Sequence, residues 1–367
     1  MSDTHKGKRM ASHKIAVIRG DGIGIEVVEE GLKVLRSASQ LYDVDLQFDE
    51  FPWGSDYYIE HGMMMPTDSL DILAKYDAIF LGAVGHPDIQ DHVTLNGLLL
   101  PIRRKFDQFV CERPNVLYPG VVSPLAGKDP WSIDMVVIRE NTEGEYANVG
   151  GFQYLGFDEE IGIQTGVFTK RGCERVIRYA FQLAELRDKK RHVTSVTKSN
   201  AQGYGMIVWD RAFTSVAEEY PDIGTESLLI DAAAMDFIRK PEEFDVVVAS
   251  NLFGDILTDI GAIITGSMGL ASSANLDPFK KYPSMFEPVH GSAPDIMGKG
   301  IANPMAQILT GALMAKHLGE RSMARGIELS VEYVLDKGET TTQDLGGSSS
   351  TSEVGDSIVA SLGQNRK

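Results

Sequence analysis

The stretch FDVVVASNLFGDILTD, residues 244–259, predicts a strand, a turn and a helix in direct succession. Its first part is a run of β-branched residues, and its second part spaces apolar residues at helical intervals. Further β-rich runs occur at residues 13–20, 75–88, 133–140 and 190–198, with helical patterns between them. Strands that alternate with helices are typical of an α/β fold with a substantial parallel component.

Length and charge narrow the classes of protein to be considered. A chain of 367 residues is long enough for two domains at roughly 150 residues each. Its 52 acidic and 35 basic side chains give a formal net charge of −17, which disfavours nucleic acid and anionic membranes as partners. No apolar run is long enough for a membrane helix, and the polar, basic residues 1–14 do not resemble a secretory signal. With only Cys111 and Cys173, a reducing cytoplasm fits best.

The glycine-rich segment GDGIG, residues 20–24, approaches a dinucleotide-binding loop but departs from its pattern. Ile25 stands where the G-x-G-x-x-G motif requires its last glycine. A tight turn between a strand and a helix is therefore the better interpretation.

Two aspartates, Asp255 and Asp259, lie one helical turn apart in the opening stretch, with no cation between them. Two solvated acids near a helix start are energetically allowed, because the positive helix end favours acids by about 0.3–1 kcal/mol, against a repulsion of about 0.2–0.5 kcal/mol. Asp231, at the end of another apolar run, offers a third carboxylate. Three carboxylates without a nearby thiolate or imidazole favour a hard cation, Mg²⁺ or Mn²⁺.

Other polar groups fall near predicted strand ends. Several arginines in an acidic protein suggest bidentate capture of carboxylates, although surface ion pairing is an equal alternative. Lys198 follows a predicted strand and would be a general base only if its pKa were depressed. The segment 287–304 is rich in glycine and proline and is either a structured loop or a ligand loop.

Together these segments resemble the β-decarboxylating dehydrogenase family, which includes isopropylmalate, isocitrate, homoisocitrate and D-malate/tartrate dehydrogenases. The resemblance extends from IAVIRGDGIG (15–24) to QDLGGSSSTSEV (343–354), and its most specific motif is NLFGDILTDIGAIITGSMGL (251–270). It implies a two-domain α/β fold with a mixed sheet that is not a Rossmann fold. A discontinuous cofactor-bearing domain would comprise residues 1–108 and 269–367, and a dimerisation domain residues 109–268, with an arm near 151–168.

Carried over position by position, the resemblance also assigns roles to single residues. The substrate carboxylates would be held by Arg103, Arg113 and Arg139. Tyr146 and Lys198 would be the acid–base pair. The metal ligands would be Asp231, Asp255 and Asp259, with Asp231 supplied across a homodimer interface. The cofactor contacts would be Glu287, His290, Gly291, Ala293, Asp295, Ile296 and Asn303.

The resemblance further implies an enzyme with NAD and Mn²⁺ or Mg²⁺ as cofactors, and it leaves open a monovalent cation such as K⁺. NADP-using relatives have Lys-Tyr where this chain has Asp295-Ile296, and an anion at Asp295 would repel a 2′-phosphate. The expected reaction is oxidative decarboxylation of a 2-hydroxy dicarboxylic acid, with closure of an interdomain cleft excluding water.

The residues expected to face the C3 substituent of the substrate are Asn96, Leu99 and Leu100. Isopropylmalate enzymes usually carry an acid at the first of these positions, so Asn96 favours D-malate, with tartrate as a related substrate. The two leucines still offer an apolar surface, which keeps 3-isopropylmalate as the alternative, since apolar pockets discriminate a methylene by only about 1–3 kcal/mol. A non-catalytic module for metal or anions would also explain the arginines and aspartates. A nucleotide hydrolase is disfavoured because no G-x-x-x-x-G-K-[ST] run occurs.

Overall fold

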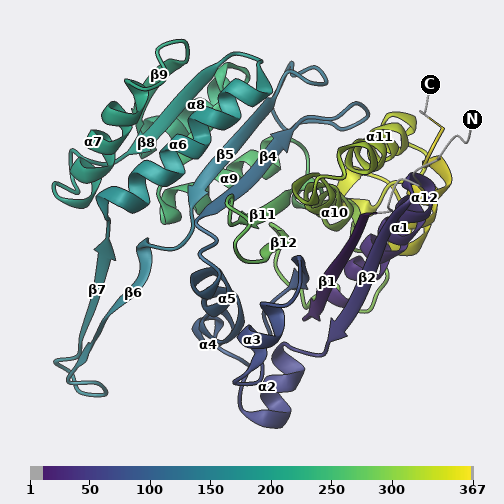
Figure 1. Cartoon of the computed structure of the whole chain (residues 1–367), viewed down its shortest axis with the longest axis horizontal. Coiled ribbons are helices and arrows are strands. Elements are labelled where there is room, and N and C mark those ends of the chain that lie inside the picture. The colour runs from purple at the N-terminus through teal and green to yellow at the C-terminus, as the bar shows by residue number, and fades with distance from the viewer. Residues whose placement is uncertain (1–10, 365–367) are drawn as a thin grey trace, which may run out of the picture.

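The computed structural model describes residues 11–364, so residues 1–10 of the amino-terminal segment discussed above lie outside the described part. Ten strands form one sheet in the order β2-β1-β3-β12-β11-β4-β5-β10-β8-β9, and β6 pairs only with β7 (Figure 1). The strands are β1 (Ala11–Gly20), β2 (Val44–Phe51), β3 (Ala78–Ala83), β4 (Val110–Val116), β5 (Asp134–Glu140), β6 (Gly144–Gln153), β7 (Ile161–Val167), β8 (His192–Thr197), β9 (Gly224–Leu229), β10 (Val246–Ala249), β11 (Ser272–Leu276) and β12 (Ser284–Pro288).

Helices cover both faces of this sheet (Figure 1). They are α1 (Gly24–Tyr42), α2 (Ser55–His61), α3 (Ser69–Leu73), α4 (Asp91–Thr94), α5 (Leu100–Lys105), α6 (Lys170–Arg187), α7 (Gly205–Ala217), α8 (Ile230–Arg239), α9 (Asn251–Ile264), α10 (Met305–Leu318), α11 (Arg321–Lys337) and α12 (Thr351–Ser361). Short 3₁₀ turns and a π-helical segment, Leu95–Leu99, complete the described elements. Within residues 11–364, no helix is both long and apolar enough to cross a bilayer.

The sheet is mixed, as expected. Strands β2, β1, β3 and β12 pair in parallel at one end, and β5, β10, β8 and β9 pair in parallel at the other. Between them, β11 and β4 make antiparallel pairs with each other and with their outer neighbours. The central strands are nearly continuous apolar runs, because helices on both sides bury both of their faces.

The segment at residues 20–24 is a tight turn from β1 into α1, as the glycine pattern predicts. Gly20 and Gly22 have φ of 69° and 56°, which side chains rarely adopt. A Cβ on Gly22 would lie 2.0 Å from the carbonyl oxygen of Ser292. The turn therefore packs directly against the loop that follows β12.

The predicted arm is a hairpin that begins earlier than expected, at Gly144 rather than near residue 151. Strands β6 and β7 extend away from the body of the protein (Figure 1). Its tip exposes the aromatic side chains of Phe152, Tyr154 and Phe157. Exposed apolar side chains on a projecting ribbon are a common feature of interaction surfaces.

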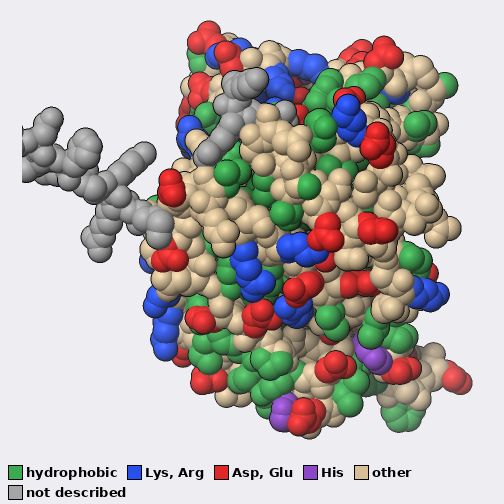
Figure 2. Space-filling view, turned by 90° about the vertical axis from the view of Figure 1, so that its right-hand side faces the viewer, with side chains coloured by type: hydrophobic (Ala, Val, Ile, Leu, Met, Phe, Trp, Pro, Cys, Tyr) green, Lys and Arg blue, Asp and Glu red, His purple; other side chains and the backbone are tan. Residues whose placement is uncertain are grey.

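On the face shown in Figure 2, acidic and basic side chains are interspersed. Ion pairs at the protein surface include Arg19 with Glu29 and Glu50, and Lys33 with Asp356. This face therefore shows no large area of a single charge (Figure 2).

Candidate active site

Helix α9 brings the two aspartates to the centre of the candidate site. It begins at Asn251, directly after the buried strand β10, and packs so closely on β5 that a Cβ on Gly254 would lie 2.7 Å from Cβ of Arg139. This contact holds the first turn of the helix against the strand that carries Arg139. Asp255 and Asp259 then project from the same helix, one turn apart.

Asp255 is compensated by two buried guanidinium groups. Arg139 forms an ion pair with its Oδ1, and Nη1 of Arg113 lies 3.2 Å from the same oxygen. The hydroxyl of Tyr146 donates to Oδ2 at 3.0 Å, and the Tyr146 ring lies under the Arg139 guanidinium, 5.4 Å from its centre. Burial acts to raise the pKa of Asp255, but the two arginines outweigh it and hold that pKa below its usual value.

Asp259 is in the opposite situation. Its carboxylate has no hydrogen-bond or ion-pair partner within the described part of the chain. Burial, followed by the negative charge of Asp255, raises the pKa of Asp259. Arg113 and Arg139 act on Asp259 only at longer range, without a direct contact, so its carboxylate is left available beside Asp255. Two carboxylate groups of this kind fit a hard divalent cation.

The three arginines predicted to hold substrate converge from three elements. Arg103 lies on α5, Arg113 on β4 and Arg139 on β5, and all three are nearly buried. Nη2 of Arg103 donates to Oε1 of Glu287 at 2.6 Å, so Glu287 contacts this arginine. The Nε atoms of Arg103 and Arg113 are buried and have no hydrogen-bond partner in the described part of the chain. These are unused donors beside the cluster, as a site for dicarboxylates requires.

Two residues that the sequence did not single out hold the arginines in place. Arg139 donates from Nε and Nη2 to Oδ1 of Asn251, at 2.9 and 2.7 Å. Arg113 donates from Nη1 to the hydroxyl of Thr258 at 2.6 Å. Asn251 and Thr258 occupy the same face of α9 as Asp255, so the helical spacing of polar residues in this motif was the available signal.

Lys198 and Asp231 form a separate ion pair within the same chain. Lys198 follows β8, and Asp231 lies in the first turn of α8, two residues after β9. Among residues 11–364, no three His, Cys, Asp or Glu side chains are placed to hold a metal, so Asp231 does not join Asp255 and Asp259 within one chain. The predicted supply of Asp231 by a second subunit stays a prediction.

Helices α8 and α9 pack together and expose apolar side chains next to these acids. Met235 and Ile238 on α8, and Ile256 and Ile263 on α9, are each about half exposed. An apolar surface of this extent beside charged groups is typical of a protein interface.

The loop after β12 borders a cavity of about 390 Å³ between α1 and the segment near residue 344. The sequence-predicted residues His290, Ala293, Ile296 and Asn303 line this cavity. Nδ1 of His290 lies 3.0 Å from the carbonyl oxygen of Gly291, while its Nε2 is buried and finds no hydrogen-bond partner among residues 11–364. Burial lowers the pKa of His290, so the ring is neutral at pH 7 and can accept or donate one bond.

The remaining predicted cofactor residues lie outside the wall of this cavity. Gly291 and Asp295 are exposed on the loop, and Glu287 lies on β12 against Arg103. Ser267 and Asp344 also line the cavity, and Asp344 accepts hydrogen bonds from Ser267 and Asn303. The mixed apolar and polar lining and the unused His290 nitrogen fit a dinucleotide.

The predicted specificity residues precede Arg103 by one to two turns. Asn96 lies in the π-helical segment and donates from Nδ2 to the carbonyl oxygen of His92 at 2.7 Å. Leu99 is buried, and Leu100 is the first residue of α5. Their expected contact with the C3 substituent is untested and stays a prediction.

Comparison with known proteins places this geometry in a family. Residues 14–358 match the family described as isocitrate/isopropylmalate dehydrogenase. The chain is 49% identical over 356 residues to the D-malate dehydrogenase [decarboxylating] of Escherichia coli (strain K12), covering 95% of this chain and 98% of that protein. It is 49% identical over 359 residues to the tartrate dehydrogenase/decarboxylase of Pseudomonas putida, covering 96% and 98%.

A solved structure gives the same result for the fold. The isocitrate dehydrogenase from Methylococcus capsulatus superposes with a TM-score of 0.87 at 34% identity, covering 95% of this chain and 99% of that one. The expected α/β class and mixed sheet are confirmed, and so is the resemblance drawn from the sequence motifs. The chain belongs to the isocitrate/isopropylmalate dehydrogenase family.

Proposed function

We propose that this enzyme catalyses the NAD-dependent oxidative decarboxylation of D-malate to pyruvate and CO₂, with tartrate as a related substrate. The observation that carries the proposal is the cluster of Arg103, Arg113 and Arg139 around Asp255. It places several carboxylate-binding groups beside two acids suited to a divalent cation. The full-length similarity to a D-malate and a tartrate decarboxylating dehydrogenase supports the same substrate class.

The division of the chain into two domains is part of the proposal. Residues 1–108 and 269–367 would form the cofactor-bearing domain, and residues 109–268 the dimerisation domain with its arm near 151–168. The strand order supports this division, because β2, β1, β3, β12 and β11 fall in the first set and β4, β5, β10, β8 and β9 in the second. The boundary would then lie between β11 and β4, near the arginine cluster.

We further propose a homodimer in which each active site draws residues from both subunits. The exposed apolar faces of α8 and α9 and the apolar tip of the arm supply the surfaces for such an interface. Since Lys198 and Asp231 form an ion pair, a second copy that brings Asp231 to Asp255 would also bring Lys198 toward Tyr146. The interface would thus complete both the metal ligands and the acid–base pair.

The mechanism follows from the charges of these groups. The loop after β12 would hold NAD, which would supply a hydride acceptor, and Asp255 and Asp259, with Asp231 from a second subunit, would hold Mn²⁺ or Mg²⁺, which would supply Lewis acidity. The arginines orient the two carboxylates, and Lys198 takes the proton of the 2-hydroxyl group. After CO₂ has left the 2-oxo acid, Tyr146 supplies a proton to the enol carbon. Burial, with the Asp255 charge, raises the pKa of Tyr146, which keeps its proton available at neutral pH.

Cofactor choice is proposed from the loop after β12. Asp295 is exposed there and carries a negative charge that would repel the 2′-phosphate of NADP, which favours NAD. A cytoplasmic location is proposed as well, since both cysteines are buried and unpaired, as a reducing compartment permits.

The alternative substrate is 3-isopropylmalate, because Leu99 and Leu100 keep an apolar surface ahead of Arg103. The test is a comparison of kcat/KM for D-malate, tartrate and 3-isopropylmalate with NAD and Mn²⁺, followed by the absorbance of reduced nicotinamide. The proposal expects the highest value with D-malate and measurable turnover of tartrate. A higher value with 3-isopropylmalate would transfer the assignment to that substrate, and no turnover of any of the three would refute it.

A further inference from the structure

A second cavity, of about 590 Å³, lies on the face of the sheet opposite the arginine cluster. Glu112 lines its floor, whereas the next residue of β4, Arg113, reaches Asp255 in the candidate active site. Successive side chains of a strand point to opposite faces, so the two sites share β4 but are separated by the sheet. The cavity is therefore distinct from both the substrate cluster and the proposed NAD loop.

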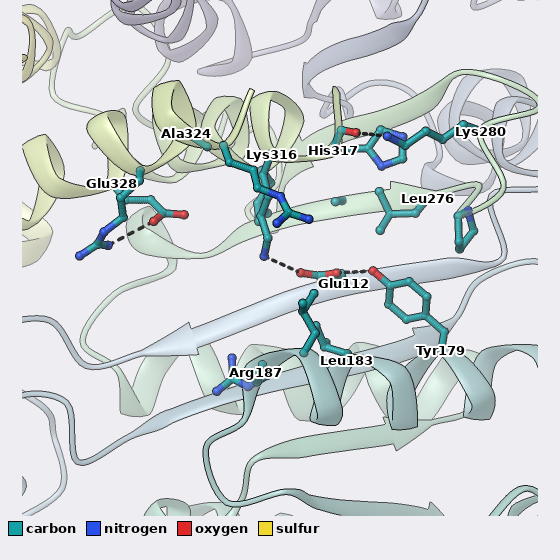
Figure 3. A pocket seen from close by; sticks show the side chains of 16 residues that line it. Glu112, Tyr179, Leu183, Arg187, Leu276, Lys280, Lys316, His317, Ala324 and Glu328 are labelled. Carbon is teal, nitrogen blue, oxygen red and sulfur yellow. Dashed lines mark hydrogen bonds and ion pairs between the residues drawn. The ribbon is translucent and has the colours of Figure 1, made fainter. Parts of the chain in front are cut away.

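The walls of this cavity are helices that pack on the two halves of the sheet (Figure 3). Helix α6 provides one wall with Leu183, Leu186 and Tyr179, and α10 and α11 provide the opposite wall. Glu112 connects the two, because Tyr179 donates to its Oε2 at 2.6 Å and Nζ of Lys316 lies 3.9 Å from its Oε1 (Figure 3). A molecule in this space would thus contact elements of both halves of the sheet.

The cavity lining contains more basic than acidic side chains, although the protein as a whole is acidic. Five lysine and arginine side chains line the cavity against two glutamates, in a chain whose net charge is −17. Burial, together with Lys280, lowers the pKa of His317 to about 4, so this ring adds no charge at neutral pH. Whether this lining favours an anion depends on which of the five cations are already paired with acids.

Two of the five cations are not committed to close partners. Arg187 pairs with Asp134 and Asp245, Lys280 donates to the carbonyl oxygen of His317, and Arg325 pairs with Glu328 and Glu332. Arg321, by contrast, is exposed and has no hydrogen-bond or ion-pair partner among residues 11–364. Within the same described range, the only ion-pair contact of Lys316 is the one to Glu112 at 3.9 Å. Arg321 and Lys316 are thus left to bind an anionic group.

Between these charges the lining is apolar. Leu183 and Leu186 on α6 face Leu276 on β11 and Leu313 on α10 across the cavity. An apolar interior with a few cationic groups at its edge matches a ligand with a hydrocarbon body and one anionic head. A multivalent hydrophilic anion would leave the leucine side chains without contact, so this lining disfavours it.

We propose that this cavity binds an amphipathic carboxylate, a compact hydrocarbon chain with a single anionic head group held by Arg321 and Lys316. The leucines of α6, β11 and α10 enclose the chain. The ligand occupies the cavity independently of NAD, since the two sites have no lining residue in common.

The test uses the full-length protein and octanoate as the probe, with binding measured by isothermal titration calorimetry at neutral pH. Octanoate is expected to bind at one site per chain and more tightly than 1-octanol, which has the same chain without the charge. Saturating NAD with Mn²⁺ should leave the octanoate affinity unchanged. Binding that NAD abolishes would assign octanoate to the cofactor site and overturn the proposal.

Two surface variants separate the cavity from general effects of charge. Arg321→Glu and Leu186→Glu change exposed side chains at the cavity edge, and each should weaken octanoate binding by about tenfold or more. Arg211→Glu on α7 is the matched control, because it changes the net charge as Arg321→Glu does at an exposed site outside the cavity. Its affinity should equal that of the unmodified protein. No octanoate binding at millimolar concentration, or equal affinity in all three variants, would refute the site.

Discussion

The substitution Asp259→Asn tests the proposed metal site with little disturbance of the fold. Asp259 lies at the surface and has no hydrogen-bond or ion-pair partner within the described residues, while partial burial, followed by the charge of Asp255, raises its pKa. Replacing it by asparagine removes the repulsion between like charges one turn apart. The free energy of unfolding should stay the same or rise by up to about 0.5 kcal/mol.

The neighbouring substitution, Asp255→Asn, has a different expected cost. Asp255 compensates Arg113 and Arg139, both of which are buried, and it accepts the Tyr146 hydroxyl. Removing one partner of a buried ion pair costs about 3–5 kcal/mol. The Asp255 side chain is 36% exposed, so solvent screens part of this cost and we expect the free energy of unfolding to fall by about 3 kcal/mol, at the low end of that range. Asp259→Asn is therefore the cleaner probe, and Asp255→Asn is its structural counterpart.

The assay compares Mn²⁺ dependence of D-malate oxidation with urea unfolding of the same preparations. For Asp259→Asn we expect at least about 100-fold weaker activation by Mn²⁺, since loss of a ligand exceeds the 10–100-fold typical of outer-shell partners. We therefore predict that Asp259→Asn keeps the free energy of unfolding of the unmodified protein and loses its activation by Mn²⁺. Full activation by Mn²⁺ in this variant would remove Asp259 from the site, and a large loss of stability would contradict the charge balance described for α9.

Three further substitutions test the turn, the buried histidine and the cofactor loop. Gly22→Ala should destabilise the protein by about 1–2 kcal/mol or more and weaken NAD binding, because its Cβ would lie 2.0 Å from the Ser292 carbonyl oxygen at a φ of 56°. Thermal unfolding and NAD titration measure the two effects. An unchanged melting temperature would contradict the close packing. Burial and then Lys280 lower the pKa of His317 from 6.5 to about 4. The unfolded chain therefore binds a proton that the folded chain does not, and the free energy of unfolding falls as the pH drops from about 6.5 to about 4. His317→Gln should remove up to about 3 kcal/mol of this fall, as measured by urea unfolding, and an identical pH dependence in both proteins would refute the prediction. Asp295→Lys should raise the ratio of kcat/KM for NADP over NAD by about tenfold, as repulsion of the 2′-phosphate becomes attraction, and an unchanged ratio would show that another residue decides cofactor choice.

Local pattern was sufficient to predict the elements that position the site. The run at residues 244–259 is a strand followed by α9, as its periodicity indicates, because propensity and burial agree there. The glycines at 20–24 form a tight turn, as predicted from the absence of the last glycine of the dinucleotide motif, whose position Ile25 occupies. The hairpin extends beyond the segment expected near 151–168, since β6 begins at Gly144.

The partners of individual side chains could not be predicted in this way. Glu287 is expected at the cofactor, and that role stays a prediction, but its ion pair with Arg103, 184 positions away in sequence, could not be read from the local pattern. The bonds from Asn251 and Thr258 to the arginines depend on how α9 packs against β4 and β5. The cavity between α6, α10 and α11 could not be predicted from the sequence, because its lining comes from segments that only the folded chain brings together.

The most direct test of the shared active site is complementation between two inactive variants, Asp231→Asn and Asp259→Asn. Each variant alone should be inactive, because every site in its homodimer lacks one ligand. If Asp231 acts across the interface, a mixed dimer has one intact site, and random exchange of subunits should restore about a quarter of the unmodified activity. If Asp231 acts within its own chain, no mixed dimer contains a complete site, and the absence of any recovered activity after demonstrated subunit exchange would contradict the account.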